Sequence, residues 1–328
     1  TNSSNGWFAN ALYYDSRKFG LLHEAVPNST LRDINLYKLY YKSDDLHLTG
    51  DTIFLTVIAA HLKAGQDASD QQTRTTMISN VMNYLGSNNY SGNIIFAGDF
   101  NMRSSFEQAY QIMVAHANPF IRLNDPVDMN GVWGNNPDMA LYHTQSPRTG
   151  SHDCFVTGGM DDRYDFILTS MPVLEGTHGL HYVDDSYVTI GQDGNRYNQS
   201  LLNPANYSQP EEVLSALYNM SDHLPVMLKM ITTDPTSVTD PFAASDAELF
   251  VTSPFREKLR IDLKSTSAGV AEISLYSVSG AKNYTVSRSI LQGINSIVED
   301  IPSLGKGVFV LRVILPNDHV ITRKIIKL

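Results

Sequence analysis

The sequence predicts an α/β domain followed by a small all-β domain. In the first part of the chain, apolar runs typical of strands alternate with amphipathic stretches typical of helices, which is the order of an α/β fold. After the Pro-, Thr-, Ser- and Asp-rich stretch TTDPTSVTDPFAASD, only short strands separated by turn residues are predicted. We expect the α/β domain over residues 1–232, a linker over 233–247 and a β-sandwich over 248–328.

The first predicted strand covers residues 52–60, TIFLTVIAA, a β-branched apolar run that ends at His61. Residues 67–86 then have the pattern of a helix. Apolar side chains recur on one face, and Ser69 with Gln72 has the spacing of a capping box.

The next segment, IIFAGDFNMRSS, begins as an apolar strand and ends in polar residues, among them Asp99 and Asn101 at alternate positions. Gly, Asp and Asn also form turns, so an ordinary strand end is an alternative interpretation. Ser104 with Glu107 predicts a second capping box and a helix that extends to about Ala117.

The rest of the α/β domain is predicted as a long loop over 118–159, a strand over 163–170, a short helix over 210–218 and a last strand over 224–231. A loop of that length is usually functional or mobile. In the β domain the predicted strands are LRIDLKS, VAEISLYSVSG, NYTVSRSIL, GVFVLRVIL and HVITRKIIKL.

Composition describes a globular protein of 328 residues, with 42% hydrophobic and 18% charged residues. The formal net charge is −10, so no basic surface indicates nucleic-acid binding, although bound cations can reverse a local field. Cys154 is the only cysteine, which excludes an intrachain disulfide and a thiolate metal cluster. No apolar run approaches the ~18 residues of a membrane span.

Polar side chains lie at the margins of several predicted strands, where open α/β sheets place ligands. They are His61, Asp99, Asn101, Asp165, Asp222 and His223. Each has an alternative interpretation as a structural residue. A lone histidine is more often hydrogen-bonded within the fold, the segment SDH could form a turn, and Asp165 could pair with Arg163.

The motifs HLKAG, GDFN, YDFIL and SDHLPV, in this order, resemble the endonuclease/exonuclease/phosphatase superfamily. That superfamily includes pancreatic-type deoxyribonucleases, neutral sphingomyelinases and inositol-phosphate phosphatases, and the resemblance covers residues 1 to about 232. It implies a four-layer α/β sandwich, two packed sheets flanked by helices, with the active site at the strand ends.

The resemblance also implies roles for the polar side chains. Asp99, Asn101 and Asp222 supply hard oxygen ligands that suit Mg²⁺, Mn²⁺ or Ca²⁺. Asp165 accepts a hydrogen bond from His223, and the pair activates the attacking water. His61 contacts the phosphate or assists the leaving group from the other side. The catalytic residues expected are thus His61, Asp165, His223, Asp99 and Asn101.

Further residues border the site in relatives or occur in the long loop. Core packing is the favoured role for two tyrosines, and two loop residues are candidates for substrate contacts. The tyrosines are Tyr13 and Tyr14, and Arg32 and Asn35 lie on segments that border the site in relatives. The loop residues are His143 and Arg148.

The last ~80 residues resemble the C-terminal sorting domain of the type IX secretion system of Bacteroidetes. The matching features are VTSPFREKLRIDL, SLYSVSGA, GVFVLRV and the basic ending TRKIIKL. The resemblance implies recognition by that machinery, export to the cell surface or the medium, and frequent removal of the tail. An accessory β-sandwich that binds carbohydrate or surface polymers is the alternative.

Relatives carry an Asn on their first strand and a Glu metal ligand on a following strand, both upstream of the segment that matches NALYYDSRKF. The first nine residues here contain no acidic side chain, and Glu24 is expected at the surface. We therefore expect the sequence to begin within the enzyme domain and the 328-residue chain to have weak or no activity.

Three functions remain open from the sequence. The first is an exported, monomeric, divalent-metal-dependent phosphodiesterase or nuclease. The second is a phosphomonoesterase or a sphingomyelinase-like lipid hydrolase on the same scaffold. The third is a surface binding protein without activity. The substrate is therefore expected to be a nucleic acid, a phospholipid or a small phosphoester.

Overall fold

The computed structural model describes residues 10–43, 46, 52–151, 155–232, 247–251, 253, 255–277 and 280–328. The chain divides into two compact units, Thr1–Ser237 and Val238–Leu328. The linker predicted over 233–247 lies outside the described residues except for Ala247. Within the described ranges, no helix is long and apolar enough to cross a membrane.

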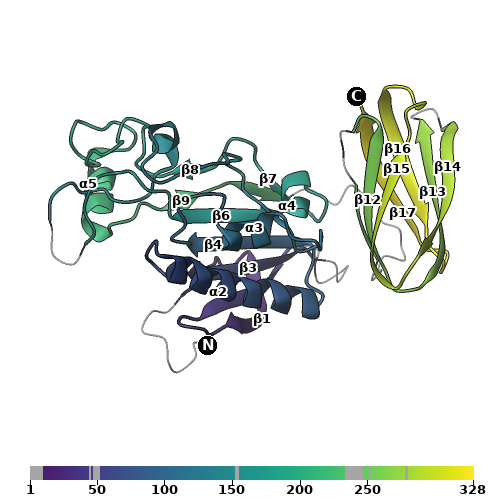
Figure 1. Ribbon diagram of the computed structural model, residues 1–328, viewed down its shortest axis with the longest axis horizontal. Coiled ribbons are helices and arrows are strands. Elements are labelled where there is room, and N and C mark those ends of the chain that lie inside the picture. Colours follow the sequence, from purple (N-terminus) through teal and green to yellow (C-terminus); the bar gives the residue numbers. More distant parts are fainter. Residues whose placement is uncertain are drawn as a thin grey trace. The chain divides into compact units, whose positions relative to one another are not determined.

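The first unit contains a six-stranded mixed sheet (Figure 1). Its spatial order is β1 (Phe19–Asn28), β2 (Ile34–Tyr41), β3 (Phe54–His61), β4 (Asn93–Asp99), β6 (Asp165–Ser170) and β5 (Leu123–Asn124). Strands β3 and β4 are parallel and the other pairs are antiparallel. The strands predicted around residues 52–60, 94–99 and 163–170 are confirmed, whereas β1 and β2 were not predicted. In β1 the central residues 21–24 are exposed, and the sequence FGLLHEAVPN has no regular alternation of apolar and polar residues that would predict a strand.

Helices α2 (Ala68–Ser87) and α3 (Gln108–Val114) cover one face of this sheet (Figure 1). Strand side chains at alternate positions, such as Ile58, Phe96 and Phe166, are fully buried against the apolar face of α2. This two-residue period leaves the odd-numbered positions of β3, β4 and β6 on the opposite face.

The helix starts differ from the predicted ones. Helix α2 begins after Asp67, and the Asp67 backbone N–H donates to the Asp70 carboxylate at 3.3 Å, so Asp67 and Asp70 form the capping box and Ser69 lies inside the first turn. Helix α3 begins after Glu107, not at Ser104, and ends at Val114.

The opposite face of the sheet is covered by α4 (Met171–Glu175) and by short paired strands. Strand β7 (Leu180–Tyr182) pairs with β10 (Met230–Thr232), and β8 (Val188–Thr189) pairs with β9 (Val226–Met227). Leu55 and Ile95 of the sheet pack with Leu180 of this layer. Helix α5 (Glu211–Met220) and the 3₁₀ helix η1 (Pro137–Tyr142) complete the unit. The strand predicted over 224–231 is thus two short strands.

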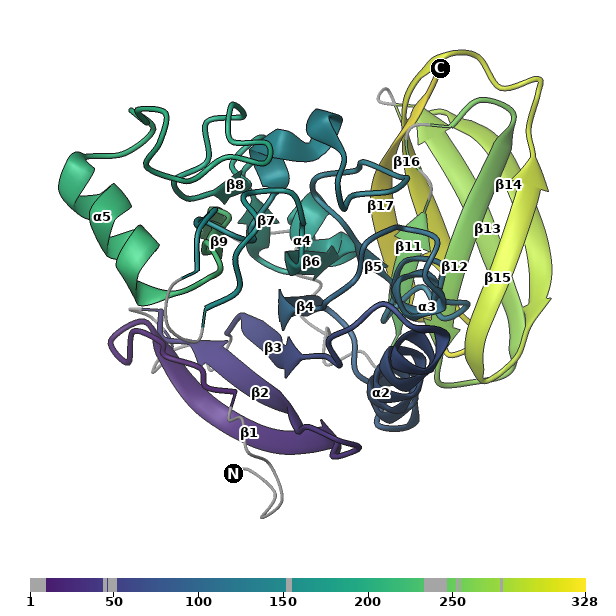
Figure 2. The same ribbon diagram turned by 60° about the vertical axis from the view of Figure 1, so that its left-hand side comes forward.

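The second unit is a β-sandwich, as predicted (Figure 2). One sheet contains β11 (Glu248–Val251), β12 (Lys258–Ser265) and β15 (Gly293–Asp300). The other contains, in spatial order, β14 (Lys282–Ile290), β13 (Gly269–Ser277), β16 (Gly307–Ile314) and β17 (Val320–Lys327). All five predicted strands are present; β11 and β15 were missed. The unit has an apolar core of its own, with Leu259, Ile273 and Leu311 fully buried.

Candidate active site at the strand ends

Three predicted site residues lie side by side on adjacent strands of the central sheet, at the same end of those strands. In the strand register, His61 of β3 is the partner of Asp99 of β4, and Asp99 is the partner of Asp165 of β6. All three are odd-numbered positions, so their side chains lie on the face opposite α2. At this end of the sheet the two parallel strands β3 and β4 finish and the antiparallel β6 begins.

His223 reaches this row from the segment between α5 and β9. Its Nδ1 lies 2.7 Å from Oδ2 of Asp165, the pairing that the resemblance implied. Its Nε2 lies 2.6 Å from Nε2 of Gln145. With the Nδ1 hydrogen donated to Asp165, Nε2 of the neutral ring accepts from the Gln145 amide. The amide also carries an acceptor oxygen, so a half-turn lets it meet the protonated ring.

Asp99 and Asn101 are fixed relative to each other by the turn that follows β4. Asn101 has a left-handed backbone with φ of +52°, a conformation that Asn tolerates better than most residues. Its N–H donates to Oδ1 of Asp99 at 3.0 Å, and its Nδ2 donates to the Leu62 carbonyl at 3.2 Å. The bond to Leu62 orients the amide so that its oxygen points away from that carbonyl. On the other side, Nε2 of His61 lies 3.3 Å from Oδ2 of Asp99.

The pKa values of these groups are displaced in opposite directions. Burial and the neighbouring Asp165 carboxylate raise the pKa of Asp99 to about 7. Burial and the positive charges of Arg32 and His223 lower the pKa of His61 to about 4. For His223, burial lowers the pKa, but the hydrogen bond to Asp165 and the surrounding carboxylates outweigh it and raise the value to about 9.

The site contains a group of side chains that could hold a metal ion. One ligand atom each of Asp99, Asp165 and His223 lies within 4.8 Å of the others. Two partly desolvated carboxylates that face each other are the arrangement that a hard divalent cation neutralises, so the residues present fit such an ion. Asp222 is not in this group: its Oδ2 accepts a hydrogen bond from the Val156 N–H at 3.0 Å. Its role as a ligand stays a prediction.

Other predicted contacts are placed differently. His143 and Arg148 are fully buried, so the prediction that they contact substrate is wrong. Arg148 instead donates to the carbonyl oxygens of Ser221 and Tyr218, just before Asp222 and His223.

The two tyrosines are not core residues, contrary to the favoured interpretation, because Tyr13 is 94% exposed and Tyr14 38% exposed. Arg32 lies beside the site, where it donates to the Leu62 carbonyl at 2.9 Å. Asn35 is buried on β2, and its Oδ1 lies 3.4 Å from Nδ2 of Asn10.

The alternative partner for Asp165 is excluded. Arg163 is fully buried and donates two hydrogen bonds to the Asp125 carboxylate, at 2.8 and 2.9 Å. Asp165 is therefore available to His223.

A buried ion pair that the sequence analysis missed connects the loops that carry the site. Arg74 of α2 donates to Oε2 of Glu107 and to the carbonyl oxygens of Lys63 and Gly65. The other oxygen of Glu107 accepts the Arg103 N–H at 3.0 Å. Glu107 is thus occupied by these bonds instead of capping a helix that begins at Ser104. The signal in the sequence is a charged residue, Arg74, on the apolar face of a helix.

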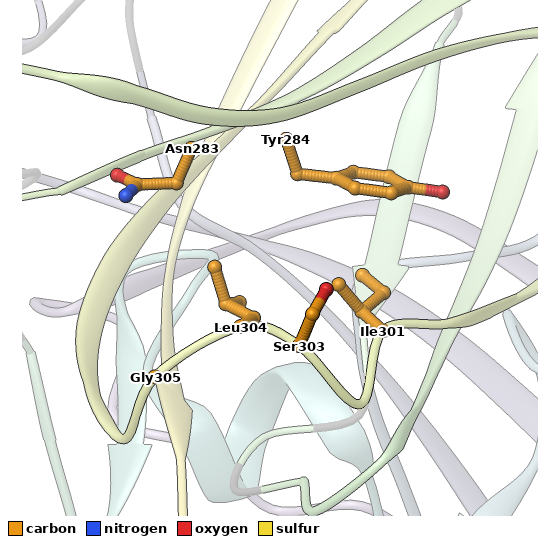
Figure 3. Close-up of a pocket in the computed structure, with 6 residues that line it drawn as sticks. All are labelled: Asn283, Tyr284, Ile301, Ser303, Leu304 and Gly305. Atoms are coloured by element: carbon orange, nitrogen blue, oxygen red, sulfur yellow. The ribbon is translucent and has the colours of Figure 1, made fainter.

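A small surface pocket lies elsewhere, on the second unit (Figure 3). It is lined by residues of β14 and of the segment between β15 and β16, with Asn283 and Tyr284 on one side and Ile301, Ser303 and Leu304 on the other. The Tyr284 hydroxyl donates to Glu299 at 2.7 Å. None of the predicted site residues lines this pocket.

Comparison with known proteins gives matches among solved structures only. No family model matches the chain, and no curated protein does. Among the structural neighbours is an endonuclease/exonuclease/phosphatase from Beutenbergia cavernae, with 14% identity and a TM-score of 0.37 over 94% of this chain and 73% of that one.

Two further neighbours cover about two thirds of this chain. An endonuclease/exonuclease/phosphatase from Bacteroides vulgatus has 14% identity and a TM-score of 0.38, over 67% of this chain and 69% of that one. TDP2 from D. rerio, solved with a single-stranded DNA product, has 15% identity and a TM-score of 0.38, over 66% of this chain and 70% of that one.

Proposed function

We propose that the protein is a divalent-metal-dependent phosphoester hydrolase of the endonuclease/exonuclease/phosphatase type that cleaves phosphodiester bonds. The observation that carries the proposal is the row of His61, Asp99 and Asp165 on adjacent strands, with His223 hydrogen-bonded to Asp165 at 2.7 Å. Water attack on a phosphoester requires a general base and a bound cation. A carboxylate–imidazole pair beside a cation-binding carboxylate can supply both.

The proton transfers follow from the hydrogen bonds. Nε2 of His223 takes a proton from the attacking water in the neutral form of the ring, while the Nδ1–H bond to Asp165 fixes the tautomer and stabilises the resulting imidazolium. The surrounding carboxylates raise the pKa of His223 to about 9, so the neutral form prevails at high pH, and a cation bound beside them would extend it to lower pH by offsetting their charge. The water oxygen forms the new P–O bond and the bond to the leaving oxygen breaks. His61, whose pKa is lowered to about 4, is neutral at physiological pH and acts as a hydrogen-bond donor to a phosphoryl or leaving oxygen.

A divalent cation would be held by the Asp99 carboxylate, with the oriented Asn101 amide oxygen and Asp222 as the other ligands. The Asp165 carboxylate would keep its hydrogen bond to His223 and add negative charge beside the ion. Bound there, the cation supplies charge neutralisation on the phosphoryl oxygens. Hard oxygen donors favour Mg²⁺, Mn²⁺ or Ca²⁺ over softer metals.

The test is hydrolysis of bis-p-nitrophenyl phosphate by the full-length natural protein, with Mg²⁺ and after chelation. His223→Ala should lower kcat by ~10²–10⁴-fold, the usual contribution of a general base. His23→Ala is the matched control, because His23 is exposed on β1. Turnover that survives chelation, or survives His223→Ala, would contradict the proposal.

The substrate class is a second question. The net charge of −10 favours small or lipid phosphoesters over long DNA, because unspecific DNA binding depends on Lys and Arg. A sphingomyelinase-like or phosphomonoesterase activity is therefore the second candidate. Parallel assays with DNA, RNA, sphingomyelin and p-nitrophenyl phosphate separate these classes, and ligand binding without turnover would favour a binding protein.

We further propose that the second unit is a type IX secretion sorting domain and that the protein is an exported monomer. The support is a separate β-sandwich with its own core, together with the sequence resemblance. Secretion of the full chain by a Bacteroidetes host, and its loss on removal of the second unit, is the test. Size-exclusion chromatography with light scattering tests the monomer.

A further inference from the structure

We propose that Gln145 positions the attacking water against Nε2 of His223; this inference rests on the function proposed above. Asp165 holds one ring nitrogen of His223 and Gln145 meets the other, at 2.7 and 2.6 Å. Nε2 is the atom that takes the proton in the proposed reaction. The amide of Gln145 therefore lies where the nucleophile must bind.

The main chain around Gln145 is held on both sides. Its N–H donates to the Asp162 carbonyl at 3.1 Å, and its own carbonyl accepts from Asp161 and Asp162 at 2.9 and 3.2 Å. The carbonyl oxygen of the preceding Thr144 accepts a hydrogen bond from the Leu224 N–H at 2.8 Å, and the Thr144 hydroxyl accepts one from the Asp165 N–H at 3.3 Å. Residue 145 is thus anchored both to the segment before β6 and to the segment that carries His223, and the amide can be displaced only by side-chain rotation.

A separation of 2.6 Å leaves no space for a water between the amide and the ring. When a water binds at Nε2, the amide rotates aside but stays within reach, because its backbone is fixed. Water has two O–H groups: one donates to Nε2 and the other can donate to Oε1 of Gln145. With both hydrogens directed to the protein, the lone pairs of the water oxygen lie on the opposite side and one can point toward phosphorus, which is the orientation that a water-positioning residue enforces in phosphoryl transfer.

Methanol as a competing nucleophile provides a test specific to this role. It has a single O–H, which must go to His223, so it has no second O–H to donate to Oε1 of Gln145. From bis-p-nitrophenyl phosphate, water yields p-nitrophenyl phosphate and methanol yields methyl p-nitrophenyl phosphate. Each reaction forms one P–O bond, breaks one and releases one p-nitrophenol, with the nucleophile's proton passing through His223 to solvent.

We expect Gln145→Met to lower kcat for hydrolysis about three- to tenfold, the rate equivalent of one neutral hydrogen bond, with KM unchanged. Methanolysis should persist, so the ratio of methyl ester to monoester rises by the same factor. Gln145→Ala should give the same shift and serves if the longer side chain disturbs folding. Gln199→Met, at an exposed glutamine, is the matched control and should leave the ratio unchanged.

The outcomes separate this inference from the proposed function. If His223→Ala abolishes turnover while the Gln145 variants keep the wild-type product ratio, Gln145 does not position the water and the inference alone is wrong. A parallel fall in both products would make Gln145 a structural residue and would also overturn it. Absence of hydrolysis by the wild-type protein would overturn both.

Discussion

Replacing Asp99 with Asn should stabilise the metal-free protein at alkaline pH. The pKa of Asp99 is raised from an ordinary 3.8 to about 7 by burial and by Asp165. A carboxyl group whose pKa is higher in the folded state than in the unfolded state has little effect on the free energy of unfolding below about pH 4, where it is protonated in both states. As the pH rises toward 7 the group lowers the free energy of unfolding by an increasing amount, and above pH 7 this loss is constant. Asn has nearly the same shape and no charge to desolvate.

The magnitude follows from the shift. About three pKa units at 1.36 kcal/mol each set an upper limit of about 4 kcal/mol for the gain in unfolding free energy at about pH 8. The Asp99 side chain is only 17% exposed, so solvent screening removes little of this. At about pH 4.5 Asp99 is protonated in the folded protein, and the gain should fall to about 1 kcal/mol. Saturating Mg²⁺ should stabilise the wild type and not the variant.

Urea unfolding followed by tryptophan fluorescence measures this effect in the first unit, because both tryptophans, Trp7 and Trp133, belong to it. Asp184→Asn, at an exposed aspartate, is the control. An Asp99→Asn variant that is no more stable at about pH 8, or equally stabilised at both pH values, would refute the electrostatic reasoning.

Three further perturbations have defined outcomes. Asp165→Asn should lower kcat tenfold to a hundredfold or more, since His223 loses the carboxylate on Nδ1; unchanged turnover would remove Asp165 from the mechanism. Arg74→Met should destabilise the first unit by about 3–5 kcal/mol, because it leaves Glu107 buried without its partner, and adding Glu107→Met should restore most of this in urea unfolding. Equal stability of the single and double variants would contradict that account. Truncation after residue 232 should preserve hydrolysis in the purified protein and prevent secretion; loss of hydrolysis would instead assign the second unit a part in catalysis.

The row of side chains at the sheet edge was predictable from local pattern. A strand has a period of two, so alternate polar residues at its end share a face, and parallel strands end at the same edge. That reasoning predicts that His61, Asp99 and Asp165 lie at the margins of strands, where open α/β sheets place ligands. The pairing of His223 with Asp165 came from the resemblance, since no local pattern connects residues 58 positions apart.

What the sequence did not predict depends on long-range packing. Gln145 meets His223 across 78 residues of chain, through a loop whose course no periodicity specifies. Ser104 and Glu107 had the spacing of a capping box, but a tertiary ion pair takes the Glu107 carboxylate and the helix starts later. His143 and Arg148 had the chemistry of substrate contacts, yet the fold buries both, where Arg148 supports the segment before His223.

The Arg74 guanidinium has a consequence for how the site opens. It binds two carbonyl oxygens of the loop after His61 and, through Glu107, the N–H of Arg103 beyond Asn101. Neither loop can detach from α2 without breaking bonds that also hold the other. Amide hydrogens of the two loops should therefore exchange with solvent as one cooperative unit, with a shared free energy of opening. Thermal fluctuations would then displace His61 and Asn101 together, so that intermediate arrangements with only one of them in place are rare.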